Sequence, residues 1–421
     1  MRTNIILFLI TFIVPLSITA QETDNGDFGI KTGGFIKNDF FYDSRQTVSA
    51  REGHFLLWPA RPSWDAENKD INEASNFNFL SIQTRLNASI SAPDAFGVKT
   101  SGYVEGAFFG HTNADINGFR LRHAYVRFDW KNSELLFGQF WNPLFVTTSF
   151  PGVVSFNTGC PFQPFSRNPQ IRLTQTLGNV KIVAAALSQR DFSSIGPAGA
   201  SSAYLRNSAM PDLHGQVHYT LSDPGAGTQF IIGGGTAYKK ILPELITAQG
   251  YKTDANVAGL TYMGFARAGL RLLTVKAQYL LGQNVNDLLM IGGYGISQIT
   301  DPLRGIVEYA PVRTSSYWMD IHSNGQAIRF GVFLGLSENL GATNDLVEGA
   351  GITGLGTDIK SLYRIAPRIV FNSGKARFAI EGEYTGANFG SVNISENRRG
   401  VPVNIEEVNN LRLLLGVYLF L

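Results

Sequence analysis

The 421-residue chain is poor in several features, and each shortage narrows the class of protein. It has a single cysteine, Cys160, so it cannot form an internal disulfide bond. Charged residues make up 16% of the chain, below the roughly 25% of an ordinary soluble domain. The net charge of +2 gives no indication of nucleic-acid binding. After the N-terminal segment no apolar run approaches the roughly 18 residues of a spanning helix, which excludes helical membrane spans.

The N-terminus has the pattern of a cleaved Sec-type signal peptide. Arg2 supplies a positive charge, residues 5–16 form a short apolar run, and mostly small residues follow up to Ala20. We therefore predict a signal peptide over residues 1–20 and one outer-membrane β-barrel domain over residues 21–421. An exported chain of this length is either a large soluble periplasmic protein or a transmembrane barrel.

The spacing of apolar residues favours a barrel. Helical periodicity is nearly absent, and segments of about ten residues alternate between apolar and polar side chains, as barrel strands do. Residues 82–90, 213–221, 328–336 and 376–384 show the alternation best. The last segment, residues 411–421, is strongly apolar and is expected to pair with the first strand.

The connections between these segments are alternately short and mostly long. The short ones, such as residues 131–132 and 372–374, carry the Asn and Gly that tight hairpins need. Short periplasmic turns opposite longer extracellular loops are typical of outer-membrane barrels, whereas a soluble sandwich has no reason for them. We predict an all-β fold, a 16-stranded antiparallel transmembrane β-barrel in the outer membrane of a Gram-negative bacterium. The expected strands are residues 33–43, 76–92, 98–110, 119–130, 133–142, 169–177, 180–190, 211–222, 228–238, 256–266, 269–283, 311–322, 326–337, 358–371, 375–386 and 408–421.

Sixteen strands leave a water-filled lumen, so function is expected there. The connection 143–168 is too apolar to float in water. We expect it to fold into the barrel as a constriction loop, with packing on the rim or at a subunit contact as the alternative. Its expected constriction residues are Phe150, Phe156, Phe162, Phe165 and Arg167.

Strand alternation also predicts which charged side chains face the lumen. Basic residues outnumber acidic ones there, which predicts a preference for anions. The alternative is that these basic residues pair with acids and leave the pore unselective. The expected pore-lining residues are Arg85, Arg172, Lys276, Arg329, Arg364, Arg368, Arg377, Arg412, Glu105 and Glu381.

Two further pore-lining residues are expected because part of the sequence resembles a known family. The stretch FRLRHAYVRFDWKNSELLFGQFWNP resembles the DcaP-type porins, and GGFIKNDFFYDSRQ and REGHFLLWPA are similar to such porins in Bacteroidota. The resemblance implies a homotrimer, passive diffusion, a preference for anions such as dicarboxylates or phosphate-like solutes, and a pore-lining role for Arg120 and Arg122. These two arginines share their strand phase with the apolar Val126 and Phe128. Either a bulge turns them into the lumen, or they point outward at lipopolysaccharide phosphates.

Other functions have less support in the sequence. An outer-membrane phospholipase or protease needs a nucleophile or acid–base set at one height on the wall, and no such grouping stands out among six scattered histidines. A structural or adhesin barrel remains an alternative. His214 and His218 have a helical metal-ligand spacing, but on a strand they lie about 13 Å apart. We therefore predict no enzyme activity, no metal and no cofactor.

Overall fold

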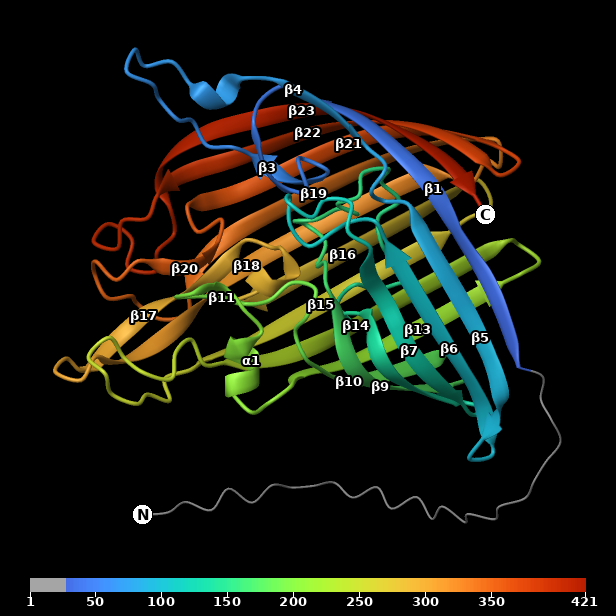
Figure 1. The fold of residues 1–421 in the computed structure, drawn as a ribbon, viewed down its shortest axis with the longest axis horizontal. Helices are drawn as coiled ribbons and strands as arrows, with labels where there is room; N and C mark the ends of the chain where they lie inside the picture. Colours follow the sequence, from blue (N-terminus) through green and yellow to red (C-terminus); the bar gives the residue numbers. More distant parts are fainter. Residues whose placement is uncertain (1–27) are drawn as a thin grey trace.

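The computed structural model describes residues 28–421, so the predicted signal peptide lies outside the described residues. The chain forms a closed, 16-stranded antiparallel barrel, which confirms the predicted fold class (Figure 1). Within residues 28–421 there is no helix long and apolar enough to span a membrane. The wall strands are β1 (Gly29–Asp43), β5 (Arg85–Ala95) with its extension β4 (Asn76–Leu80), β6 (Val98–Ala107), β7 (Arg120–Asp129), β8 (Ser133–Trp141), β9 (Arg167–Leu177), β10 (Val180–Leu187), β13 (Asp212–Asp223), β14 (Thr228–Ile241), β15 (Val257–Gly269), β16 (Leu273–Gln283), β18 (Ile306–Ser323), β19 (Ile328–Ala342), β21 (Ile359–Ser373), β22 (Ala376–Ser391) and β23 (Val403–Phe420).

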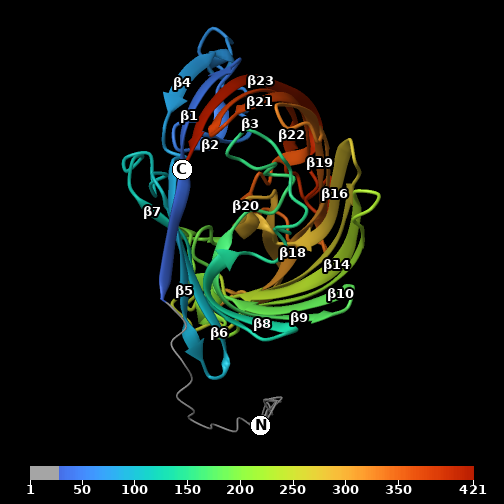
Figure 2. The same cartoon turned by 90° about the vertical axis from the view of Figure 1, so that its right-hand side faces the viewer.

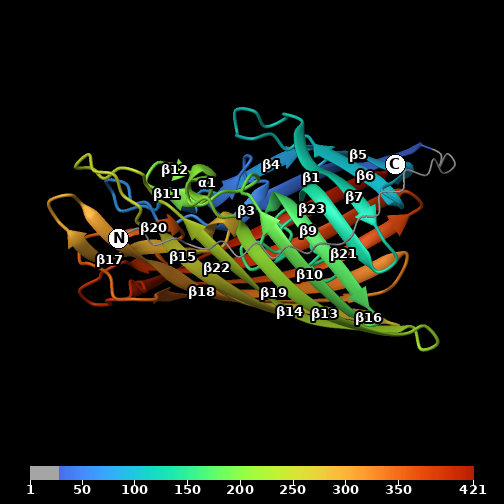
Figure 3. The same cartoon turned by 90° about the horizontal axis from the view of Figure 1, so that it is seen from below.

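The two ends of the chain close the barrel. Strand β1 pairs antiparallel with β23, with Phe35 opposite Phe420 and Asp43 opposite Arg412. On its other side β1 pairs with β4 and β5. Every wall strand therefore has two neighbours, and the barrel has no open edge. The strands run obliquely to the long axis of the molecule (Figure 3), as closure of a sheet into a barrel requires.

The predicted strand 76–92 is wrong as one continuous element. Residues 81–84 leave the strand conformation and separate β4 from β5. Ile82 is only 1% exposed and packs inside the barrel, whereas Leu86 on β5 is 44% exposed on the outer wall. Ile82 belongs to an apolar cluster inside the lumen. Because it turns inward to reach that cluster, the alternation of the strand is interrupted at residues 81–84.

Several loops contain elements of their own. The connection from β1 to β4 holds a hairpin of β2 (Thr47–Ala50) and β3 (Phe55–Pro59), followed by the short helix η1 (Ile71–Glu73). Strand β17 (Gly292–Asp301) extends the wall beyond the barrel by pairing with β18 and with β20 (Ile352–Leu355). The remaining elements of the loops are β11 (Ile195–Gly196), β12 (Gly199–Ala200), α1 (Ala203–Asn207) and η2 (Asn286–Leu288).

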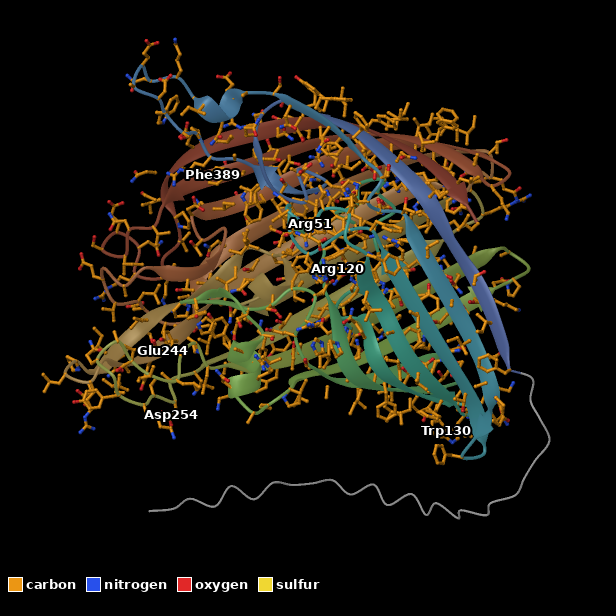
Figure 4. All side chains as sticks on the ribbon, in the orientation of Figure 1. Arg51, Arg120, Trp130, Glu244, Asp254 and Phe389 are labelled. Carbon is orange, nitrogen blue, oxygen red and sulfur yellow. The ribbon has the colours of Figure 1, made fainter. Side chains whose placement is uncertain are left out.

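The wall has an apolar outer face and a more polar inner face. On β13, Val217 is 51% exposed on the outside, while His214 and His218 face inward and are buried. An apolar outer band is what hydrocarbon around a barrel requires. Trp130 lies at the end with the short turns, and Phe389, Glu244 and Asp254 lie toward the opposite end with the longer loops (Figure 4). We call these the turn side and the loop side.

Candidate pore and its constriction

The loop between β8 and β9 crosses the lumen (Figure 2). Strand β8 ends at Trp141 and β9 begins at Arg167, so the loop is residues 142–166, slightly shorter than predicted. Its tip reaches the opposite wall, where the backbone N–H groups of Val154 and Ser155 donate to the Glu381 carboxylate at 2.8 and 2.9 Å. These bonds hold loop 142–166 across the interior.

The expected constriction phenylalanines divide into two sets. Phe156, Phe162 and Phe165 are fully buried in an apolar cluster that joins loop 142–166 to the wall. Phe156, for example, stacks on Phe109 with 4.1 Å between ring centroids. Phe150 is 36% exposed and borders the open space on the turn side. Three of the rings therefore anchor the loop, and only Phe150 meets solvent.

Arg120 and Arg122 lie in the interior because of a bulge. Glu105 on β6 is opposite His123, but the next residue, Gly106, is opposite Leu121, so Arg122 is an extra residue in β7. The bulge changes the phase of the strand and leaves both arginines buried. Arg122 Nε donates to Glu105 Oε1 at 2.6 Å.

Arg120 belongs to a second ion-pair group and lies near the middle of the molecule in Figure 4, between Trp130 at the turn side and Glu244 at the loop side. Its guanidinium pairs with Asp191 in the loop after β10. Arg167, which is the first residue of β9 and not part of the loop, donates to the same carboxylate at 2.7 Å. Two arginines therefore share one aspartate at this position.

Three of the predicted pore-lining arginines are enclosed by the loop segments. They face the barrel interior, but each is paired with a carboxylate and nearly inaccessible to solvent. Arg364 lies 3.5 Å from Glu383, Arg368 lies 2.8 Å from Asp320, and Arg412 lies 2.6 Å from Asp43. Arg364 and Arg412, like Glu381, hydrogen-bond to loop backbone, and Arg368 is held by Asp320. We therefore do not propose an open pore-lining position for these residues.

The open part of the lumen lies between loop 142–166 and the short turns. Two cavities of about 550 and 220 Å³ share the lining residues Tyr125, Phe140, Phe145 and Thr147, and so adjoin one another in this part of the lumen. We call this space the vestibule. Its basic lining residues are Arg85, Arg122, Arg377, Arg127, Arg172 and Lys181. Among the described residues, Glu105 and Glu134 are the only carboxylates that line it.

Four of the basic groups of the vestibule have no carboxylate partner within residues 28–421; they are Arg85, Arg172, Lys181 and Arg377. Arg172 lies over the ring of Phe140 at 5.0 Å, and Arg377 lies over that of Phe420 at 4.9 Å. Aromatic faces hold a guanidinium in place without neutralising it. The vestibule therefore carries excess positive charge.

The two remaining predicted residues lie at the edge of the pathway. Lys276 donates to the Phe150 carbonyl at 3.0 Å and so contacts the exposed part of the loop. Arg329 is exposed at the turn side, where it donates to the Gly325 carbonyl at 2.7 Å. Sequence reasoning missed Lys181 and Arg127. Lys181 lies opposite His218, which faces inward on β13. This neighbour would show that Lys181 also faces inward, but the pair can be recognised only when the strand register is known.

No cluster of three or more His, Cys, Asp or Glu side chains suited to a metal ion occurs from Phe28 onward. His214 and His218 both face inward on β13, with Gln216 between them on the same face. Cys160 is buried in loop 142–166, and its thiol lies 3.3 Å from the Leu289 carbonyl oxygen.

Comparison with solved structures identifies the architecture. The outer membrane channel DcaP of Acinetobacter baumannii superposes with a TM-score of 0.66 at 13% identity, over 94% of this chain and 97% of that one. An anion-selective porin from Comamonas acidovorans gives 0.54 at 12% identity, over 94% and 100%. Salmonella typhi OmpF, in complex with daunomycin, gives 0.53 at 12% identity, over 93% and 97%.

At these identities the similarity shows a shared fold, that of 16-stranded outer-membrane porins. No family model and no curated protein matches the sequence.

Proposed function

We propose that this protein is an outer-membrane porin, a non-enzymatic channel for passive diffusion of small hydrophilic solutes, with a preference for anions. The observation that carries the proposal is the vestibule, where four basic groups without a carboxylate partner line the open part of the lumen. A low-dielectric wall concentrates the field of such charges along the lumen and raises the local concentration of anions.

The chemistry of these groups suits dicarboxylates and phosphate-like anions. A guanidinium presents planar, paired N–H donors that match carboxylate and phosphate oxygens. Neither Arg85 nor Arg172 is paired with an acidic side chain of the described chain, although Arg172 donates Nε to Gln170 and one terminal nitrogen to the Trp141 carbonyl. We propose such solutes as those the channel favours.

The same proposal includes the setting of the channel. After cleavage of the signal peptide, the barrel lies in the outer membrane with its short turns in the periplasm and its longer loops at the lipopolysaccharide layer. It forms a homotrimer, as the resemblance to DcaP-type porins implies.

Planar-bilayer recording in a KCl gradient tests the proposal. The wild-type channel is expected to give an anion-selective reversal potential, and the triple variant Arg85→Ala, Arg172→Ala, Arg377→Ala is expected to move it toward zero. Arg398→Ala is the matched control, because it removes one positive charge from an exposed loop outside the vestibule. A cation-selective potential contradicts the anion preference, and an absence of conductance contradicts the channel itself.

A further inference from the structure

The hairpin of β2 and β3, residues 47–59, lies inside the barrel. Figure 2 shows both strands within the ring of wall strands, near β21 and β23. Phe55, Leu56, Leu57 and Trp58 are all buried, with at most 7% of each residue exposed. A loop at the barrel surface does not bury four consecutive large apolar side chains. Hairpin 47–59 therefore fills part of the lumen.

Charged wall residues hold the backbone of this hairpin. Arg412 donates to the Gly53 carbonyl at 2.7 Å, and Arg364 donates to the Leu57 carbonyl at 2.8 Å. His54 lies 2.7 Å from the Asp39 carboxylate of β1. Both arginines are also paired with carboxylates of the wall, so they supply hydrogen bonds with little net charge.

The hairpin is also joined to loop 142–166. The ring of Phe55 packs edge-on against Phe156 and Phe165, with centroids 5.5 and 5.1 Å apart. Arg364 bridges the two segments, because it also donates to the Cys160 carbonyl at 2.8 Å. The hairpin and the loop thus form one packed unit against the wall of β21 to β23.

We infer that hairpin 47–59 is a second constriction element, which sets the size limit of the channel jointly with loop 142–166. This inference rests on the proposed porin function. The four unpaired basic residues of the vestibule do not contact the hairpin, so removing the hairpin widens the channel without removing those charges. Shortening loop 142–166 alone leaves part of the cross-section filled.

Excision of the hairpin tests the inference directly. Thr47 and Pro59 are opposite one another in the hairpin, so a two-residue Asn-Gly turn can replace residues 48–58. The excised protein is expected to show about twofold higher single-channel conductance, because conductance follows the open cross-section. Proteoliposomes carrying it are expected to swell in oligosaccharides that the wild type excludes, while the reversal potential in KCl stays unchanged. Shortening the exposed turn 65–68 of the same connection is the control and is expected to change none of these values.

A milder variant covers the case in which the excised barrel does not fold. Phe55→Ala removes the ring that joins the hairpin to the loop, and it is expected to raise conductance by a smaller factor. Phe77→Ala, which removes a ring 63% exposed on β4, is its control. Folding of each variant is checked by the heat-dependent shift of the barrel in detergent electrophoresis.

The possible failures are distinguishable. Unchanged conductance and size limit in the folded excision variant overturn the inference; if that variant does not fold, an unchanged Phe55→Ala channel overturns it. A wild-type protein without conductance overturns the proposed function instead.

Discussion

Charged residues on the inner wall divide into two kinds according to their partners. Arg364, Arg368 and Arg412 are each matched by a buried carboxylate, and Arg364 and Arg412 also donate to loop carbonyls. Arg85 and Arg172 have no such match within the described chain and face the vestibule. Strand alternation predicts an inward direction for all five, but it cannot separate them, because the difference depends on which loops fold back onto the wall.

Glu105 is one of two carboxylates in the vestibule, and its charge offsets that of Arg122. We expect Glu105→Gln to leave Arg122 uncompensated and to shift the reversal potential further toward the anion side. The measurement is a bilayer recording in a KCl gradient, with Glu67→Gln, in an exposed loop, as the control. A shift toward cations contradicts this account of the vestibule.

The pair of Arg412 and Asp43 is buried, with both side chains at most 1% exposed. Arg412→Ala leaves the Asp43 carboxylate without its cation in a place that water does not reach. Loss of one partner of a buried pair costs about 3–5 kcal/mol. We expect a clear fall in the temperature at which the folded band converts to the unfolded band in detergent electrophoresis. Arg398→Ala, with an exposed side chain, is expected to leave that temperature unchanged.

At the scale of elements, β7 shows how one residue changes a strand. Without the extra residue at Arg122, the alternation that places Val126 outside also places Arg120 outside. Because of the bulge, β7 has apolar residues on its outer face near its turn-side end and two inward-facing arginines near its other end. From the sequence, the two arginines can face inward only if the alternation of the strand changes phase. The residue at which it changes depends on how β7 pairs with β6, and alternation alone does not reveal that pairing.

Loop 142–166 is held at its tip by Glu381 and along its length by buried aromatic rings. Deleting residues 150–162 removes the tip and two of those rings, Phe156 and Phe162, together with the exposed Phe150, so single-channel conductance is expected to rise. If hairpin 47–59 shares the constriction, the rise is smaller than in a variant that lacks both segments. A folded deletion variant with wild-type conductance contradicts a place for the loop in the pathway.

At the scale of the whole molecule, the strand number, the antiparallel order and the two sets of connections could be predicted from the sequence. They depend on local signals, alternation and turn residues, that recur along the wall. The hairpin 47–59 and the break at Ile82 could not be predicted, because both depend on apolar contacts with distant segments inside the lumen. The extension formed by β17 and β20 could likewise not be predicted, because it pairs only with other extensions of the wall and is not part of the closed ring.

The oligomeric state is the prediction that belongs to this scale. We expect a homotrimer that survives mild detergent, because the apolar outer wall allows side-by-side association and the resemblance of the sequence to DcaP-type porins implies a trimer. Light scattering with correction for bound detergent is expected to give three times the protomer mass. A protomer mass under the same conditions contradicts the prediction.

The seam between β1 and β23 also constrains how the protein can be made. Phe35 and Phe420 lie opposite one another although almost the entire chain separates them, so their pairing closes the longest loop available to this polypeptide. Contacts of such sequence separation form slowly. Until β23 has been synthesised and exported, β1 lacks one of its two neighbours and presents unpaired backbone groups that invite aggregation. We therefore expect assembly to depend on shielding of the first strand until the last one is available.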